Sequence, residues 1–251
     1  MLLAINIGNT NINFGIFTQN SSKKNNKTAL KFNLAVKNYS RAKLAKKLGL
    51  HPEISKIIIC SVIPKLTKIV QLNLKSLTGI NARIIGKDLA VPIKNLYHQP
   101  KQLGQDRLVN AYAASQLYST PLIVIDSGTA ITLDVVSKNR TFLGGLIMVG
   151  VEMSLAALNE KTALLPKIRL TQPLKLIGQD TKSSILSGII FGTTAAIDEL
   201  TKQIKRYLGK NTLIIGTGGN IPLIKRNSKI KIHVDKDLTL RGIKLINENE
   251  I

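Results

Sequence analysis

Two short stretches of this sequence repeat one pattern, in which an apolar run ends in a short polar residue and a glycine. The first is Leu3-Ala-Ile-Asn-Ile-Gly-Asn-Thr10, and the second is Ile123-Val-Ile-Asp-Ser-Gly-Thr-Ala130. In each copy the apolar run predicts a buried strand, the glycine permits a tight turn, and a second strand follows over residues 11–17 or 131–136. The repeat predicts two β-hairpins in a duplicated α/β chain, whose halves we place at residues 1–118 and 119–251.

Two glycine hairpins of this kind can hold a nucleotide. Backbone N–H groups and the side chains of Thr or Asn can surround phosphate oxygens without adding negative charge. Either loop alone is more simply interpreted as a tight turn at Gly8 or Gly128. The presence of both loops favours phosphoryl transfer.

The rest of the chain predicts further helices and strands in a mixed α/β order. Helical periodicity, caps and breakers indicate where most of these elements begin and end. We expect helices at about residues 41–48, 66–77, 107–117, 152–161 and 183–207, and strands at 57–63 and 213–215.

The charge is the most unusual feature of the composition. The chain carries 36 Lys and Arg against 14 Asp and Glu, a formal net charge of +22. Such a chain attracts polyanions nonspecifically, so nucleic-acid binding is a rival hypothesis. The basic residues are spread along the chain and only 4% of residues are aromatic. We therefore expect no specific nucleic-acid partner.

Other bulk features predict a packed cytoplasmic protein. The sequence has 251 residues, of which 44% are hydrophobic, and no apolar run approaches the roughly 20 residues that span a bilayer. The single cysteine, Cys60, lies in an apolar run, where a buried thiol is expected rather than a nucleophile. The three histidines are far apart, which makes a histidine metal cluster improbable.

Several further segments have the order and spacing of one enzyme family, and together they cover essentially the whole chain. They are residues 5–11, Ser61-Val-Ile-Pro64, Gly104-Gln-Asp-Arg107, Asp126-Ser-Gly-Thr-Ala130, Gly144-Gly145, Leu165-Pro166, Thr181, Ser187-Gly188 and Thr217-Gly-Gly219. In these segments the sequence resembles the type III pantothenate kinases, members of the superfamily of acetate and sugar kinases, heat-shock protein 70 and actin.

The resemblance implies a duplicated actin-like (ribonuclease H-like) fold, with two similar halves around a nucleotide cleft. It implies ATP-dependent phosphorylation of pantothenate to 4'-phosphopantothenate, the first step of coenzyme A biosynthesis. It also implies Mg²⁺ with the ATP, an activating monovalent cation (K⁺ or ammonium), and a homodimer whose partner subunit contributes to the substrate pocket. The basic chain is compatible with both acidic substrates but selects neither.

Asp106 is the candidate general base, the role that the resemblance assigns to the aspartate of Gly-x-Asp-Arg. Without the resemblance, a helix cap at the start of the following helix is the simpler interpretation of Asp106. Arg107 could orient an anionic substrate through charge-assisted hydrogen bonds, or it could form a solvated ion pair.

The resemblance supplies the remaining site residues. Tyr97 and Thr181 are expected substrate contacts, and the alternatives are a half-buried aromatic and a helix N-cap. Asp126 is expected to hold the monovalent cation, and the alternative is a brace for its own turn. The full expected set is substrate-binding Tyr97, Gly104, Gln105, Asp106, Arg107 and Thr181, and nucleotide-binding Asn6, Ile7, Gly8, Asn9, Thr10, Asn11, Ile12, Asn13 and Thr129.

The chain departs from the family pattern at Asn6, where the family has an aspartate that helps to organise Mg²⁺. The neutral amide keeps one carbonyl oxygen but is a poorer partner for a divalent cation. Three explanations are open: compensation through Asp126 or Asp134, a weakened or repurposed homologue, or an engineered substitution. Two milder departures are Gln105, in place of a small residue, and Val149, in place of proline.

Overall fold

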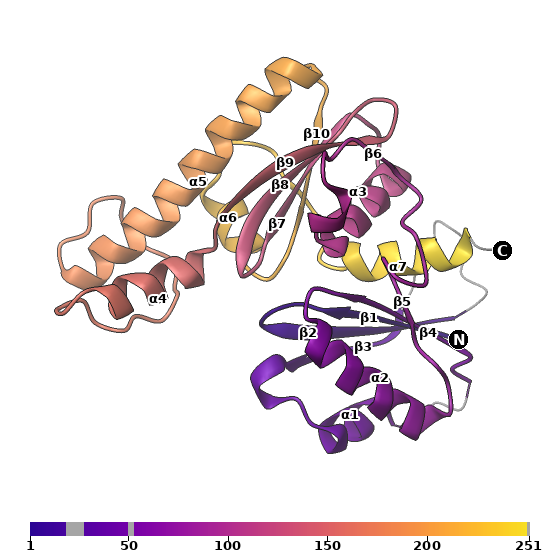
Figure 1. The fold of residues 1–251 in the computed structure, drawn as a ribbon. Coiled ribbons are helices and arrows are strands. Elements are labelled where there is room, and N and C mark those ends of the chain that lie inside the picture. The colour runs from indigo at the N-terminus through magenta and orange to yellow at the C-terminus, as the bar shows by residue number, and fades with distance from the viewer. Residues whose placement is uncertain (19–27, 50–52, 250–251) are drawn as a thin grey trace. The chain divides into compact units, whose positions relative to one another are not determined.

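The computed structural model describes residues 1–18, 28–49 and 53–249. By packing, the chain forms two compact units, and each contains one of the sheets drawn in Figure 1. Unit 1 comprises Met1–Ile93, His98–Ala113 and Asp237–Ile251, and unit 2 comprises Lys94–Tyr97 and Ala114–Lys236.

The sheet of unit 1 has five strands in the order β3-β2-β1-β4-β5. β1 pairs antiparallel with β2 and parallel with β4. The strands are β1 (Leu2–Ile7), β2 (Asn11–Phe17), β3 (Thr28–Ala35), β4 (Lys56–Ser61) and β5 (Arg83–Ile84).

The sheet of unit 2 has six strands in the order β11-β10-β7-β8-β9-β6. β7 pairs antiparallel with β8 and parallel with β10, as β1 does with β2 and β4. The strands are β6 (Lys94–Asn95), β7 (Leu122–Ser127), β8 (Ala130–Val136), β9 (Thr141–Val149), β10 (Leu213–Thr217) and β11 (His233–Val234).

The two sheets share one chain order. Apart from β6, which adds an edge to the second sheet, each has three consecutive antiparallel strands, continues through helix to a parallel strand, and adds an outer parallel strand after another helix. The predicted duplication is therefore confirmed. The helices are α1 (Arg41–Leu48), α2 (Pro64–Thr78), α3 (Gln105–Leu117), α4 (Val151–Lys161), α5 (Thr181–Leu208), α6 (Ile221–Asn227) and α7 (Leu238–Glu248), with short 3-10 turns at Val36–Asn38 and Pro100–Gln102.

The last helix packs in unit 1, although in chain order it belongs to the second repeat. α7 contacts β1, β2 and β4, so the first sheet depends on the C-terminal end of the chain. The boundary predicted between residues 118 and 119 separates the two copies of the repeat. Whether it also separates two domains stays a prediction.

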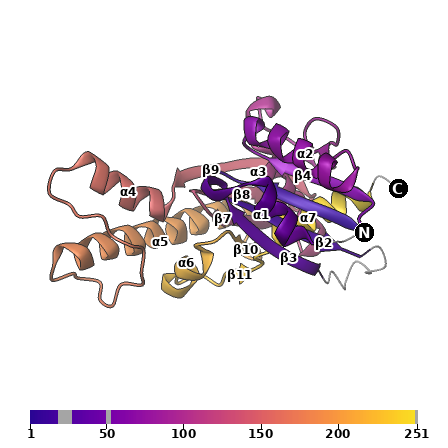
Figure 2. The same ribbon diagram turned by 90° about the horizontal axis from the view of Figure 1, so that it is seen from below.

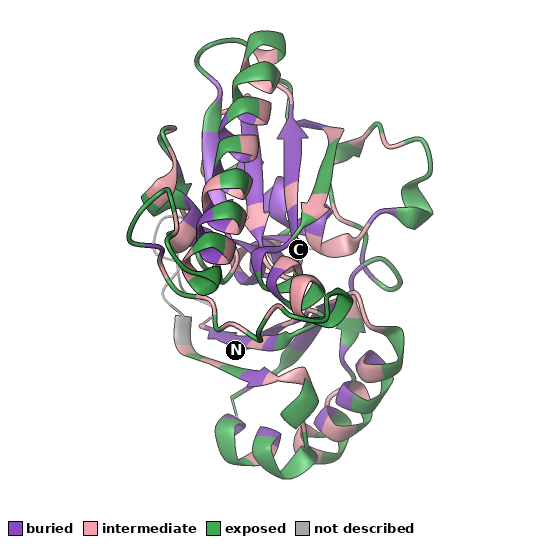
Figure 3. Cartoon of the chain, turned by 90° about the vertical axis from the view of Figure 1, so that its left-hand side faces the viewer, coloured by how far each residue is buried: buried purple, intermediate pink, exposed green. Residues whose placement is uncertain are grey.

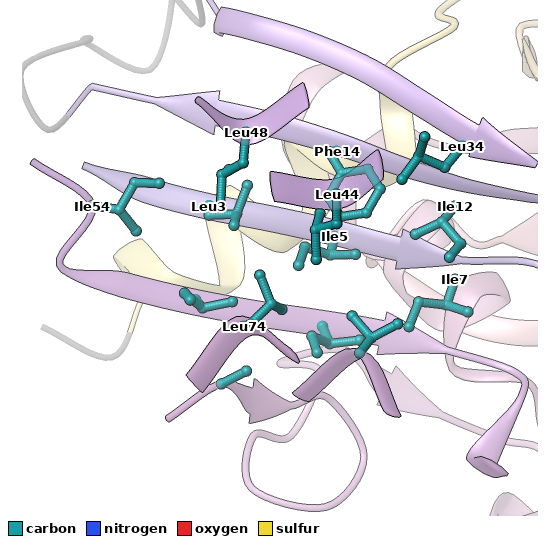
Figure 4. Close-up of a cluster of buried hydrophobic side chains, with 14 of the residues drawn as sticks. Leu3, Ile5, Ile7, Ile12, Phe14, Leu34, Leu44, Leu48, Ile54 and Leu74 are labelled. Carbon is teal, nitrogen blue, oxygen red and sulfur yellow. The ribbon is translucent and has the colours of Figure 1, made fainter. Parts of the chain in front are cut away.

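One hydrophobic core of unit 1 lies on one face of its sheet (Figure 4). Side chains alternate between the two faces of a strand, so Leu3, Ile5 and Ile7 of β1 all reach this core. Leu44 of α1 and Leu74 of α2 cover them. The opposite face of β1 is left for Leu2, Ala4 and Asn6.

In unit 2, the long helix α5 begins at a capping box. The Asp180 carboxylate accepts a hydrogen bond from the Ser183 N–H at 2.9 Å, and the Ser183 hydroxyl accepts one from the Asp180 N–H at 3.2 Å. α5 lies beside α4, as Figure 2 shows. Strands β7, β8 and β10 of the second sheet are largely buried, while the helices keep exposed faces (Figure 3).

The predicted helices are confirmed, with ends that differ by at most two residues. The strand over residues 28–35 was not predicted, because the polar composition of residues 20–40 hides its alternation; residues 20–27 of that stretch lie outside the described residues. Within the described part of the chain, no helix is both long and apolar enough to cross a membrane.

Candidate active site

The first glycine loop joins β1 to β2 and is held by backbone hydrogen bonds. The Gly8 N–H donates to the Asn11 carbonyl at 3.0 Å, and the Thr10 carbonyl accepts from the Val36 N–H at 2.9 Å. Asn9, Thr10 and Asn11 are exposed. The loop therefore presents a run of polar residues on a fixed turn, as a phosphate-binding loop requires.

Two predicted nucleotide-binding residues of this loop have side chains that point away from solvent. Ile7 and Ile12 are fully buried in the core of unit 1 (Figure 4). They are register partners in the β1–β2 pair. Only their backbone groups are available to a nucleotide, and their side chains anchor the loop.

A row of polar side chains crosses the other face of the first sheet. Asn6 is the register partner of Asn13 on β2 and of Cys60 on β4. Since the neighbours of these residues in sequence point into the core, the three side chains share the opposite face. Asn6 and Asn13 are partly exposed, and Cys60 is fully buried.

Asp106 stands in the first turn of α3, in unit 1. Its Oδ1 accepts a hydrogen bond from the Arg107 N–H at 2.9 Å, and a Cβ placed on Gly104 would lie 2.7 Å from the same oxygen. The glycine of Gly-x-Asp-Arg therefore leaves the space that the carboxylate occupies. The Arg107 side chain is only 7% exposed, which excludes the solvated ion pair considered above.

Burial and charge link Asp106 to the polar row. Burial raises the pKa of the Asp106 carboxyl, and the bond from the Arg107 N–H and the Arg107 charge oppose that rise. Burial also raises the pKa of the Cys60 thiol well above its ordinary range, and the Asp106 charge raises it further. The prediction that Cys60 is a buried thiol is thus confirmed.

Gln105 lies over a turn that follows β5. A Cβ on Gly86, whose φ is +86°, would lie 2.7 Å from Gln105 Cδ and 2.8 Å from Gln105 Cγ. Gln105 is larger than the residue that the family has here, and it fits because residue 86 is a glycine. Gly86 was not among the predicted site residues. A glycine before Lys-Asp in an otherwise apolar stretch was the available signal of a positive φ.

The second glycine loop, in unit 2, joins β7 to β8 and surrounds Asp126. The Gly128 N–H donates to the Ala130 carbonyl at 3.0 Å, and the Asn220 N–H donates to the Ser127 carbonyl at 2.9 Å. A Cβ on Gly218 would overlap the Asp126 carboxylate, and one on Gly128 would lie 3.7 Å from it. Gly218 thus makes room for this carboxylate, whereas a Cβ on residue 128 would make only an ordinary contact with it.

Oxygen-bearing side chains gather on the same face as Asp126. Thr132 on β8 and Thr217 on β10 are its register partners. The Thr132 hydroxyl donates to Asp134 Oδ2 at 3.0 Å, and Asp134 is fully buried. These are the oxygen donors that hard cations prefer. Across the described residues, no three His, Cys, Asp or Glu side chains form a metal-binding group.

The turn of the second loop is packed against the residue that caps α4. A Cβ on Gly150 would lie 2.7 Å from the Gly128 carbonyl oxygen and would overlap the Thr129 carbonyl. Val149, which stands before this glycine, is 54% exposed. The backbone of Thr129 therefore passes so close to residue 150 that only glycine fits there.

The last two predicted substrate contacts lie elsewhere in unit 2. Tyr97 follows β6 and is partly exposed, and its N–H donates to Asn95 Oδ1 at 2.9 Å. Thr181 is the exposed first residue of α5. The suggestion that Thr181 caps this helix is wrong, because the cap is Asp180.

The predicted residues therefore fall into two groups, one in each unit. Asn6, the first loop and residues 104–107 belong to unit 1, whereas Asp126 and Thr129 belong to unit 2. The polar rows around each group were missed, because strand pairing, which places Cys60 beside Asn6 and Thr217 beside Asp126, cannot be read from local sequence.

Comparison with known proteins gives a consistent family. Residues 2–203 match the family profile described as type III pantothenate kinase. A protein named type III pantothenate kinase from Dehalococcoides mccartyi is 37% identical over 248 residues, which cover 98% of this chain and 96% of that protein. Another of that name, from Finegoldia magna, is 38% identical over 261 residues, covering 99% and 97%.

Solved structures share the fold at low sequence identity. A putative Baf family transcriptional activator from Campylobacter jejuni matches with a TM-score of 0.63 at 22% identity, covering 99% of this chain and 98% of that one. An activator of 2-hydroxyisocaproyl-CoA dehydratase from Clostridium difficile, solved with ADPNP, matches with a TM-score of 0.54 at 12% identity, covering 99% and 96%.

Proposed function

Because this chain belongs to the type III pantothenate kinase family and has its duplicated actin-like fold, we propose that it phosphorylates pantothenate with ATP. The product is 4'-phosphopantothenate, and the reaction is the first step of coenzyme A biosynthesis. The observation that carries the proposal is similarity along almost the whole chain to relatives named for this activity. The protein is then a transferase that acts on an alcohol group.

Asp106 is the general base in this proposal. The primary hydroxyl of pantothenate gives its proton to the Asp106 carboxylate while its oxygen attacks the γ-phosphorus, and ADP leaves as the β,γ-bridging bond breaks. The partial burial of Asp106 and the raised pKa of its carboxyl support this role, since a more basic carboxylate accepts a proton more readily. The Arg107 N–H bond holds the carboxylate in place.

The other substrate contacts follow the family pattern. Arg107 is proposed to pair with the pantothenate carboxylate, since a guanidinium binds carboxylates through paired hydrogen bonds. Gly104 and Gln105 form the wall beside it. Tyr97 and Thr181 are proposed as further contacts to pantothenate, and their partial or full exposure leaves both accessible.

The nucleotide phosphates are proposed to bind the two glycine loops. Residues 8–11 offer exposed polar groups on an anchored turn, and Asn6 and Asn13 extend that surface into the sheet. Ile7 and Ile12 contribute backbone groups only. Thr129 is the contact from the second loop.

Two kinds of cation fit the oxygen donors of the two loops. Asn6 and Asn13 offer neutral oxygens that suit the water shell of Mg²⁺ brought by ATP, where the ion would offset phosphate charge. Asp126, with Thr132 and Thr217 as register partners, offers the charged oxygen site that K⁺ or ammonium needs. Asp126 has the charge that Asn6 lacks.

A homodimer in the cytoplasm completes the proposal. Unit 2 exposes a set of large apolar side chains on α4 and the segment after it, a composition typical of subunit interfaces. The buried free thiol of Cys60 suits a reducing compartment. The exposed set is Met153 (45%), Leu164 (91%), Leu174 (98%), Leu176 (69%) and Ile177 (78%).

The test is a phosphorylation assay on the purified protein. Pantothenate, ATP, Mg²⁺ and K⁺ are supplied, and phosphopantothenate is measured beside an Asn6→Asp variant. We expect turnover by both proteins, with the variant faster by about tenfold because a carboxylate restores the divalent-cation partner. If neither protein turns over while Asp106 is intact, the proposed activity is wrong and a noncatalytic role replaces it.

A further inference from the structure

A basic pocket of about 860 Å³ lies in unit 2, where α5 ends and β10 begins. None of the described residues that line it is acidic. An ion pair at its edge joins Lys202 to Glu199 at 3.8 Å, between two exposed side chains. Its basic lining residues are Lys202, Lys205, Arg206, Lys210 and Lys231.

Stabilisation of helix α5 explains only some of the basic residues that line the pocket. Lys205 and Arg206 lie in the last turn of α5, where cations interact favourably with the helix dipole. Lys210 lies beyond the end of the helix, and Lys231 comes from the segment before β11. Neither lysine is part of a helix, and both line the same pocket as the basic residues of α5.

The walls of the pocket are fixed by hydrogen bonds. At the end of α5, the Gly209 N–H donates to the Lys205 carbonyl at 2.8 Å, and the Thr212 hydroxyl donates to the Gly209 carbonyl at 2.6 Å. On the other side, the buried carboxylate of Asp198 accepts from the Ser228 hydroxyl at 2.5 Å and from the Lys229 N–H at 2.7 Å. The segment that carries Lys231 is thereby tied to α5.

The pocket also has an apolar part. Leu213, Ile214 and Ile230 line it together with the basic residues, and Leu213 is 40% exposed. A volume of about 860 Å³ lies within the range of small-molecule pockets, about 300–1,000 Å³. An extended nucleic-acid strand would instead call for a groove that runs past the pocket on both sides.

We propose that this pocket binds a small molecule that carries at least two phosphate groups and an apolar or aromatic moiety. The lysines and the Arg206 guanidinium would hold the phosphates through charge-assisted hydrogen bonds, and Leu213 and Ile230 would contact the apolar part. The site is independent of the proposed kinase chemistry, since no residue assigned to catalysis lines it.

The test follows the backbone amide signals of residues 209–212 by nuclear magnetic resonance as inorganic tripolyphosphate or ATP is added. These signals report on the pocket itself, whatever binds at the phosphate loops. We expect saturable shifts, with ATP binding at least about threefold more tightly because of its base and ribose. In a Lys210→Gln, Lys231→Gln variant the affinity should fall by about tenfold or more, while basal kinase activity is retained.

A matched control separates the pocket from general charge. A Lys68→Gln, Lys75→Gln variant loses the same two charges from exposed positions on α2 in unit 1 and should change affinity less than about twofold. Equal losses in the two variants would overturn the proposal, as would equal affinities for the two ligands. A preference of the same signals for a single-stranded oligonucleotide, growing with its length, would also overturn it in favour of nucleic-acid binding.

Discussion

The side chain of Gln105 packs directly on Gly86, with only 2.7 Å between Gln105 Cδ and the position that a Cβ on residue 86 would occupy. Gln105 precedes the proposed base Asp106, so this contact fixes the start of α3 against the turn after β5. The large Gln105 side chain, at a position where the family has a small residue, therefore fits because Gly86 has no side chain.

Replacing Gly86 by alanine should disturb this contact and weaken the fold. The φ of +86° costs an L-residue about 1–2 kcal/mol, and moving the flexible Gln105 side chain off the new Cβ adds a smaller cost of about 0.5–1.5 kcal/mol. Chemical denaturation measures the free energy of unfolding. We also expect kcat to fall, since Gln105 must move next to Asp106.

Gly79→Ala is the matched control, because Gly79 has a φ of +74° and no atom lies within 4 Å of the position that its Cβ would occupy. The Gly79→Ala variant should lose only the free energy that the positive φ costs an L-residue, about 1–2 kcal/mol. A Gly86→Ala, Gln105→Ala double variant should recover most of the difference between the two glycine variants. Equal losses at Gly79 and Gly86 would contradict the proposed packing.

Gly104→Ala should impair catalysis far more than folding. The new Cβ would lie 2.7 Å from Asp106 Oδ1, so the carboxylate must leave its present position. We expect kcat/KM to fall by about 10²-fold or more, the usual effect of misplacing a general base, with the unfolding midpoint nearly unchanged. Gly188→Ala, where a Cβ meets nothing within 4 Å, is the control in steady-state assays and should keep full activity.

Local sequence predicted the hairpins, most helices and the duplicated fold, because glycine turns and apolar periodicity leave local signals. It could not predict that Cys60 lies beside Asn6, since that pairing joins β4 to β1 across the intervening β2, β3 and α1. It also could not show that Ile7 and Ile12 point into the core, which requires knowing the buried face. Roles that depend on strand register or on through-space contact were therefore missed.

The raised pKa of Asp106 predicts an unusual pH dependence of catalysis. The base must be ionised to accept a proton, so kcat/KM should fall as pH drops through the raised pKa. The acidic limb should therefore lie above the ordinary aspartate value of about 3.9. Steady-state kinetics in buffers of constant ionic strength measure the limb, and a limb at the ordinary value would argue against Asp106 as the base.

Linkage gives a second prediction for the same residue. A carboxyl whose folded-state pKa exceeds its unfolded value binds its proton more tightly when folded, so its contribution favours the fold at low pH and is lost as pH rises through that window. Asp106→Asn removes this penalty. We expect unfolding experiments at pH 7 to find the variant at least as stable as the parent, with turnover reduced by about 10³-fold. Marked destabilisation would indicate a structural role.

Asp126→Asn should weaken activation by the monovalent cation, because Asp126 is the proposed ligand of that ion. Loss of the carboxylate beside Gly128 and Gly218 removes a close Coulomb interaction, so the K⁺ concentration for half-maximal activation should rise by about tenfold or more. Thermal unfolding in KCl against choline chloride gives a readout without turnover, and the stabilisation by K⁺ should disappear. Glu160→Gln, the same charge change at an exposed position in unit 2, should leave both effects intact. An unchanged response to K⁺ in Asp126→Asn would instead leave Asp126 as a brace for the second loop.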